Sequence, residues 1–97
     1  MSAAGKRHMA RVAAAGCVIG NRGLGECSGR NEVHHVAEGS GLRSEFGVAC
    51  LCNGHHRGAA GLHGLGSKAF IRLYRPPGDS EYGLLVWANE DMAKEAA

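Results

Sequence analysis

Histidine and cysteine gather in one short part of this 97-residue chain. Five of its six histidines lie between residues 34 and 63, as the pairs His34-His35 and His55-His56 and the single His63. Cys52 stands just before the second pair, in the order Cys52-x-x-His55-His56. Because imidazole and thiolate are the commonest ligands of zinc and related ions, this clustering predicts a metal-binding chain.

The size and composition of the chain favour a metal that staples the fold. A domain of 97 residues is near the lower limit at which one hydrophobic core is comfortable. Aromatic side chains make up only 5% of the residues and glycine occurs 16 times, so apolar burial alone would leave the fold marginal. Metal binding can supply the missing stability.

The formal net charge of +2 is distributed unevenly along the chain. Residues 1–16 carry three basic side chains and no acid, and residues 17–78 carry seven basic and four acidic side chains. Residues 79–97 carry five acids and a single base, Lys94. The first two segments could therefore meet a polyphosphate, whereas the last would repel one.

The four cysteines raise the question of disulfides, which require export. The one candidate for an export signal is the run Val12 to Gly16 before Cys17. Its apolar part is about five residues long, whereas a signal peptide needs roughly 7–15. No stretch approaches the length of a membrane span. We therefore expect a cytoplasmic protein without a membrane partner, whose reduced thiols are available as ligands.

The expected secondary structure places the His and Cys cluster on a hairpin and on the helix behind it. We expect an N-terminal helix over residues 2–15 that Gly16 stops, and a glycine-rich loop or knuckle from Gly20 to Gly29. Two strands, Glu32 to Ala37 and Phe46 to Leu51, should pair around a turn at Gly39 to Gly41. A short or irregular helix then begins near Asn53, its expected N-cap.

Two further helices are expected after this core. The segment Ser67 to Tyr74 has helical spacing, is ended by Pro76-Pro77, and should bury Phe70 and Tyr74. Ser80 can cap a last helix that carries the apolar residues Leu84, Leu85, Trp87 and Ala88.

This order of elements and motifs resembles the HNH endonucleases, the ββα-metal or His-Me finger nucleases, and most closely the phage recombination-enhancement-function (Ref) nuclease family. The motifs that carry the resemblance are Lys6-Arg7-His8-Met9, Cys17-Val18-Ile19, Glu32-Val33-His34-His35-Val36, Leu51-Cys52-x-x-His55-His56-Arg57, Leu62-His63-x-x-Gly66, Phe70-x-x-x-Tyr74 and Glu81-x-x-Leu84-Leu85. Together they cover nearly the whole chain. The resemblance implies an α+β fold with a treble-clef-like ββα-metal core and a zinc knuckle. It also implies one nuclease domain over residues 1–97, with a basic N-terminal helix (1–16), the metal-binding core (17–66) and C-terminal helices (67–97).

The resemblance also implies an active site. Hydrolysis of a phosphodiester needs a water, a base that takes its proton, and a cation such as Mg²⁺, Mn²⁺ or Zn²⁺. By resemblance, His35 is the base, and His34 and His56 are metal ligands. His63 is an expected additional ligand, and Glu45 takes the middle position of the family pattern. Because adjacent strand residues point to opposite faces, His34 and His35 reach one phosphate only if the strand ends, twists or bulges there.

A second, structural zinc site is implied by the cysteines. The family has a Cys-x-x-Cys knuckle before the first strand, but here Gly20 stands where the second cysteine is expected. Cys27 in the glycine-rich loop could replace it, with Cys50 as its rival. We therefore expect zinc on Cys17, Cys27, Cys52 and His55, and for Cys50 we favour a buried, small hydrophobic role.

The partner that the resemblance implies is DNA, cut with low sequence specificity, in phage recombination or DNA processing inside a bacterial host. A recombinase filament is a second candidate partner, since Ref nuclease cuts DNA held by such a filament. Arg57, Lys68 and Arg72 are the expected phosphate contacts. Two alternatives stay open: a catalytically degenerate zinc module that binds nucleic acid without cutting it, and a structural or adaptor protein without metal.

Overall fold

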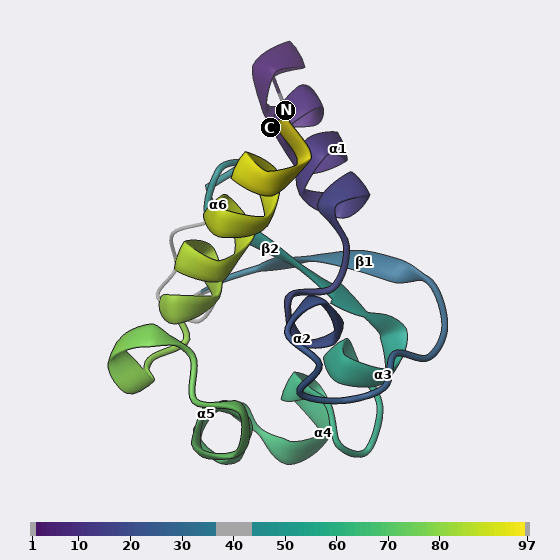
Figure 1. The fold of residues 1–97 in the computed structure, drawn as a ribbon, viewed down its shortest axis with the longest axis vertical. Helices are drawn as coiled ribbons and strands as arrows, with labels where there is room; N and C mark the ends of the chain where they lie inside the picture. Colours follow the sequence, from purple (N-terminus) through teal and green to yellow (C-terminus); the bar gives the residue numbers. More distant parts are fainter. Residues whose placement is uncertain (1, 37–43, 97) are drawn as a thin grey trace.

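The computed structural model describes residues 2–36 and 44–96, in a small α+β fold with helices around a two-stranded antiparallel sheet (Figure 1). The elements in chain order are α1 (Ala3–Ala15), α2 (Val18–Asn21), β1 (Asn31–His35), β2 (Val48–Cys52), α3 (Asn53–His56), α4 (Leu62–Leu65), α5 (Ser67–Tyr74), the 3-10 turn η2 (Pro77–Asp79) and α6 (Gly83–Ala96). Among the described residues, no helix combines the length and the hydrophobicity that crossing a bilayer requires.

The predicted hairpin is present and forms the centre of the fold. Strands β1 and β2 pair in antiparallel register, with His34 opposite Ala49 and His35 opposite Val48. The second strand begins at Val48 rather than at Phe46, whose side chain is exposed. The last residue of the predicted first strand, Ala37, and the predicted turn at residues 39–41 lie outside the described residues.

Strand β2 is buried along its whole length because both faces of the hairpin are covered. On one face, Ala49 and Leu51 join a hydrophobic cluster that contains Phe70 and Leu84, and Trp87 closes its edge. On the other face the cluster members are Val48, Cys50, Val12 and Met92, which come from β2, α1 and α6. Helix α1 and the later part of α6, which lie side by side in Figure 1, therefore cover one face of the sheet. The start of α6, together with α2 and α5, contributes to the cluster on the other face.

The predicted helices form where local sequence favours them. The Ser2 hydroxyl caps α1 by accepting the Gly5 N–H at 2.9 Å, and Gly16, with φ of 91°, ends the helix. Helix α5 has the predicted bounds, and both of its aromatic side chains, Phe70 and Tyr74, are buried in the core.

Two local expectations were wrong. The N-cap of α3 is Cys52, whose sulfur accepts the His55 N–H at 3.4 Å, and not Asn53, because the strand runs directly into the helix. The expected loop at residues 20–29 starts later, because Val18–Asn21 forms a helical turn. Buried Val18 and Ile19 pin this turn into the core.

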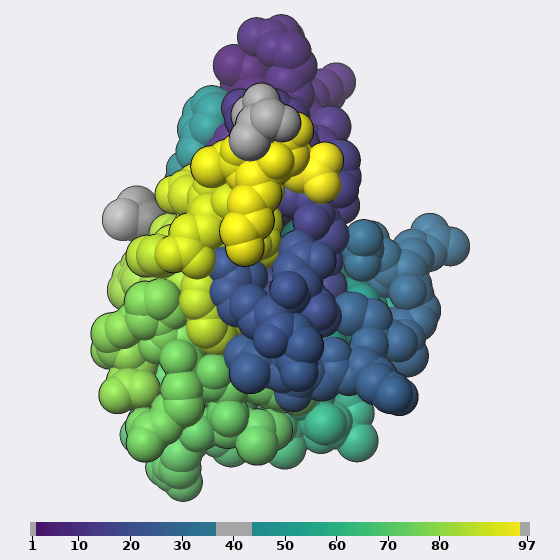
Figure 2. All heavy atoms as spheres, viewed as in Figure 1, coloured from purple at the N-terminus to yellow at the C-terminus, as the bar shows by residue number. Residues whose placement is uncertain are grey.

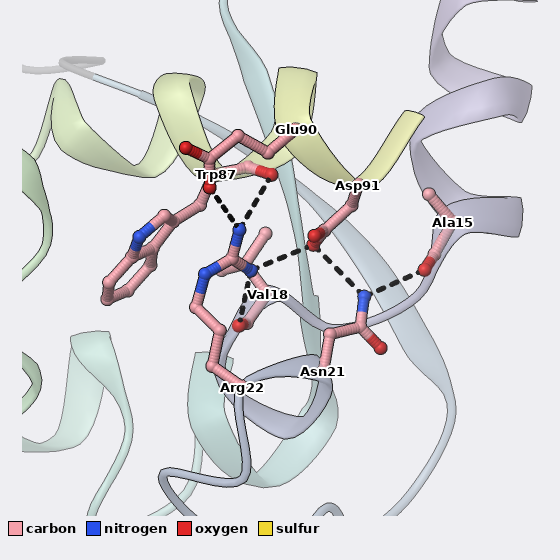
Figure 3. Close-up of polar contacts among 7 residues, drawn as sticks. All are labelled: Ala15, Val18, Asn21, Arg22, Trp87, Glu90 and Asp91. Carbon is pink, nitrogen blue, oxygen red and sulfur yellow. Dashed lines mark hydrogen bonds and ion pairs between the residues drawn. The ribbon is translucent and has the colours of Figure 1, made fainter. Parts of the chain in front are cut away.

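One arginine joins this turn to the C-terminal helix (Figure 3). The Arg22 guanidinium lies 4.7 Å from the Trp87 ring centroid and donates to the Asp91 carboxylate at 3.0 Å and to Glu90 at 2.8 Å. Asp91 is only 4% exposed and also accepts a bond from Asn21. In Figure 2 the dark blue segment after α1 lies directly against the yellow C-terminal helix. No local pattern predicts this contact, because Arg22 and Asp91 stand 69 positions apart.

We expect Arg22→Ala to lower the free energy of unfolding by about 3 kcal/mol, because the buried Asp91 carboxylate loses its cation. Glu90→Ala, which removes the partner that is 55% exposed, should cost less than about 1 kcal/mol. Urea denaturation followed by circular dichroism measures both values. If the two variants lost equal free energy of unfolding, the buried Arg22–Asp91 pair would contribute no more to stability than the exposed Arg22–Glu90 pair.

Candidate metal centres

Four residues expected to hold zinc come together at one point. A ligand atom of each of Cys17, Cys27, Cys52 and His55 lies within 4.8 Å of the others, a separation that a single ion can bridge. The His55 Nδ1 atom lies 3.1 Å from the Cys52 sulfur and 3.6 Å from the Cys17 sulfur. Three thiols and one imidazole form a donor set that zinc binds as a tetrahedron. This group, the sulfur centre, could hold a metal ion.

The structure shows why Cys27 can replace the missing cysteine of the knuckle. A Cβ atom added to Gly20 would collide with the Cys27 sulfur. The thiol therefore occupies the space of a side chain at position 20, and only glycine there leaves room for it. The glycine-rich loop carries Cys27 back to α2, so the knuckle closes through a residue seven positions later.

Cys50 is not part of the sulfur centre. Its side chain is buried among Val12, Val48 and Met92, on the face of the hairpin that α1 and α6 cover. Burial, together with the nearby Cys17 and Cys52 thiols, raises its pKa to about 12. The favoured reading of Cys50 as a small hydrophobic residue agrees with this position, and the rival reading as a ligand does not.

Electrostatics in the sulfur centre favour a bound cation. Although burial opposes ionisation, backbone N–H groups of His55 and Ser28 hold the pKa of Cys52 below its ordinary value. Burial and the neighbouring Cys52 and Cys17 sulfurs raise the pKa of Cys27 to about 12. Burial also lowers the pKa of His55, which keeps its ring neutral and able to donate a lone pair. Without a cation these thiols resist ionising together, and with one they can all be thiolates.

A second group joins three histidines from three elements. Ligand atoms of His34 on β1, His56 on α3 and His63 on α4 lie within 4.8 Å of one another, so this histidine centre could also hold a metal ion. The Nε2 atoms of His56 and His63 are 3.2 Å apart. His34 and His56 are buried and His63 is exposed, which leaves the group open to solvent on one side.

His63 reaches this centre by a different route from the one expected. The expected route was a continuous helix that would place His56 and His63 on one face. Instead α3 ends at His56, and α4 begins at Leu62 after a tight turn. Gly61 sits so close to the backbone of Gly54 and His55 that a side chain there would collide with it. The glycines thus fold the chain back and bring His63 to His56.

Two carboxylates missed by sequence reasoning contact the histidine centre. The Glu32 carboxylate lies 2.8 Å from His56 Nδ1, and the Glu81 carboxylate lies 3.0 Å from His34 Nε2. Bonds from His56 and then from Asn53 lower the pKa of Glu32. Such carboxylates fix the orientation and tautomer of a ligating histidine. Glu32 could have been found, since it precedes His34 by two positions on the same strand face, but Glu81 gave no local signal.

Burial, opposed by Glu32, lowers the pKa of His56 and keeps its ring neutral near pH 7. With Nδ1 directed at Glu32, the Nε2 atom is the one that faces His63. His56 therefore offers its lone pair where a metal ion would be shared with His63.

His35 lies at the end of β1 and not within the histidine centre. The pairing of β1 with β2 is regular through the His35–Val48 pair, with no bulge. Strand alternation therefore gives His35 the face of Val48 and Cys50, opposite to that of His34. The strand ends at His35, which is one of the conditions under which both imidazoles could reach one phosphate.

The expected role of Glu45 as a metal ligand was wrong. Its carboxylate accepts the Ser2 N–H at 2.6 Å and the Ser2 hydroxyl at 2.7 Å. These bonds lower its pKa and place the negative charge at the N-terminus of α1, where the helix dipole favours it. Glu45 therefore holds the first helix onto the hairpin rather than binding the ion.

The expected DNA-contacting residues all lie near the histidine centre. The Arg57 side chain is 64% exposed and lies 3.5 Å from the Glu32 carboxylate, which in turn contacts His56. Lys68 and Arg72 are exposed on α5 and line a hollow that Glu81 also borders. Arg57 is thus linked to the histidine centre through Glu32, and the hollow that Lys68 and Arg72 line is linked to it through Glu81.

We expect Cys27→Ser to remove about one equivalent of bound zinc per chain, because three ligands hold the ion much less tightly than four. Combining Gly20→Cys with Cys27→Ala should restore the zinc, since alanine removes the atom that a Cβ at position 20 would meet and the new thiol can take its place. Elemental analysis after gel filtration measures the metal content. Zinc retained by Cys27→Ser, or lost equally from both variants, would contradict this ligand arrangement.

Comparison with known proteins gives no family for this chain. It matches no protein-family model, no curated protein and no solved structure. The resemblance to HNH and Ref nucleases therefore rests on the order and spacing of the motifs themselves. The chemistry of the sulfur centre and the histidine centre is what indicates function.

Proposed function

We propose that this protein is an HNH-type endonuclease that hydrolyses DNA phosphodiester bonds with a divalent ion at the histidine centre and a structural zinc at the sulfur centre. The observation that carries the proposal is the convergence of His34 from the hairpin with His56 and His63 from the two short helices behind it. This convergence supports the proposal because a hairpin and the helix behind it would hold the ion together in a ββα-metal arrangement.

The histidine centre suits catalysis better than a structural role. Structural zinc sites have four protein ligands, whereas catalytic sites keep an open position for water or substrate. Of the described residues only three form this group, and one of them is exposed. When bound there, a divalent ion supplies charge stabilisation for a scissile phosphate and its leaving oxygen.

The chain's own side chains provide the remaining functions. His35, next to the ligand His34 and at the end of its strand, is the proposed base that takes a proton from the attacking water. Glu32 contacts Nδ1 of His56, and Glu81 contacts Nε2 of His34. Each carboxylate therefore orients one of the two histidine rings. Arg57, Lys68 and Arg72 bind the DNA backbone, which carries little base information, so sequence preference is weak.

The sulfur centre has a structural role that reaches the active site. His55 belongs to the sulfur centre and its neighbour His56 to the histidine centre, within the same short helix. A zinc ion that fixes Cys52 and His55 therefore also fixes the direction of His56. Phage recombination, with DNA alone or on a recombinase filament, is the proposed setting and follows from the family resemblance.

A non-cleaving, zinc-containing DNA-binding module is the second candidate. The observation that favours it is the position of His35 on the opposite strand face from His34. In that case both metal groups would stabilise the fold, and the basic side chains would bind DNA without cutting it.

We expect purified protein with Mg²⁺, Mn²⁺ or Zn²⁺ to nick supercoiled plasmid, and His35→Ala to slow nicking by about 100-fold or more, as loss of a general base does. His8→Ala is the matched control, because the His8 ring lies against Phe46, 5.1 Å away between centroids, and belongs to neither centre. Plasmid binding without nicking by the wild-type protein would favour the non-cleaving module.

The two centres should respond differently to loss of a ligand. His63→Ala should abolish nicking with little change in melting temperature, since this side chain is exposed. Cys52→Ser should lower stability strongly, because metal at a hundredfold excess over its Kd stabilises a fold by about 2.7 kcal/mol. Thermal melts with and without chelator provide the comparison. A melting temperature insensitive to both Cys52→Ser and chelator would refute the structural zinc.

A further inference from the structure

A hollow of about 400 Å³ runs along α5, beside the histidine centre. Its lining includes Lys68, Ile71, Arg72 and Arg75 from α5 and its end, and Asp79 and Glu81 from the segment that follows. This volume is within the range of small-molecule sites, which is roughly 300–1,000 Å³. The proposed function gives two of these residues, Lys68 and Arg72, contacts to the DNA backbone, but assigns no ligand to the hollow itself.

The charges around the hollow leave two cations available for an anion. Arg75 pairs with Asp79 at 3.3 Å, and Glu81 is engaged with His34 at 3.0 Å. Within residues 2–36 and 44–96, neither Lys68 nor Arg72 takes part in an ion pair. These two residues are four positions apart, so they share one face of the helix and stand about 6 Å apart along it. Their spacing suits the oxygens of one phosphate or of two successive phosphates.

The floor of the hollow is apolar. Ile71 lies between the two cations in sequence, lines the hollow and packs against the hydrophobic core. A purely inorganic anion gains nothing from such a surface, whereas a sugar or base can bury apolar area on it. The combination of two unpaired cations and an apolar floor therefore matches a nucleotide.

The hollow is continuous with the histidine centre through a single side chain. Glu81 borders the hollow, and its carboxylate lies 3.0 Å from the Nε2 atom of His34. We infer that the hollow binds the nucleotide next to the scissile phosphate, with its phosphate on Lys68 and Arg72 and its sugar or base on Ile71. This inference rests on the proposed nuclease function. It implies that the bound DNA strand runs from the three histidines along α5.

The test is the salt dependence of binding to a fluorescently labelled oligothymidylate, measured by anisotropy in the His35→Ala background, which prevents cutting. Each phosphate contact on a single strand contributes about 0.7 to the slope of log K against log salt. Lys68→Gln with Arg72→Gln removes the contacts to one phosphate and should therefore lower the slope by about 0.7. Arg11→Gln with Lys94→Gln removes the same charge from α1 and α6, and should leave the slope unchanged.

Competition distinguishes a nucleotide from phosphate alone. Thymidine monophosphate should displace the oligothymidylate at lower concentration than inorganic phosphate, and this advantage should disappear in Ile71→Ala. In plasmid nicking by the chain with an intact His35, the Lys68 and Arg72 changes should raise KM more than they lower kcat, as loss of ground-state binding does.

The outcomes separate this inference from the proposed function. An unchanged slope in the Lys68 and Arg72 variant, or equal competition by the two anions, overturns the nucleotide site even if the wild-type protein nicks plasmid. Absence of nicking with the predicted change in slope overturns the nuclease and keeps the site as part of a DNA-binding module. Circular dichroism melts confirm that each variant is folded before it is compared.

Discussion

The crowding of three sulfurs and one imidazole is the constraint on which the rest of the structure depends. The ligand residues come from three parts of the chain, namely Cys17, Cys27 and the junction of β2 with α3 that carries Cys52 and His55. Their ligand atoms lie within 4.8 Å of one another. Burial and the neighbouring Cys52 and Cys17 sulfurs raise the pKa of Cys27, and a bound cation would oppose that effect. In a small chain with 16 glycines, a metal ion bound at this centre would hold together segments that apolar burial alone would hold weakly.

The two centres are joined by adjacent residues and a short set of polar contacts. Helix α3 gives His55 to one centre and His56 to the other. Asn53, at the start of the same helix, donates to Glu32 at 3.3 Å, and Glu32 contacts His56 at 2.8 Å. The backbone N–H of Asn53 also bonds to the carbonyl of Arg30, at 2.8 Å. The loop that carries Cys27 is thus tied to the helix that carries both ligands, so the sulfur centre and the histidine centre form one unit.

Several features were predictable because they depend on local sequence. The N-terminal helix, the hairpin and the helix Ser67 to Tyr74 follow from capping residues, alternation and prolines. The members of the sulfur centre and of the histidine centre were expected from the family resemblance, whereas residue type and order alone do not group them. The pairing of Arg22 with Asp91 and that of Glu81 with His34 were not predictable, since each joins residues far apart in the chain. The role of Glu45 was misjudged because alignment to a motif does not show where a loop carboxylate will find its donors.

By itself the sequence determined which residue types could bind metal, and in what order they occur along a hairpin and a short helix. Only the tertiary structure decided how they are grouped. Backbone turns at Gly58 and Gly61 bring His63 to His56, and the lack of a side chain at Gly20 admits the thiol of Cys27. Strand register gives His34 and His35 opposite faces. The physical reason is that side chains can share a metal ion only if they lie close together in space. Steric fit and strand register, which are properties of the folded chain, decide which side chains do so.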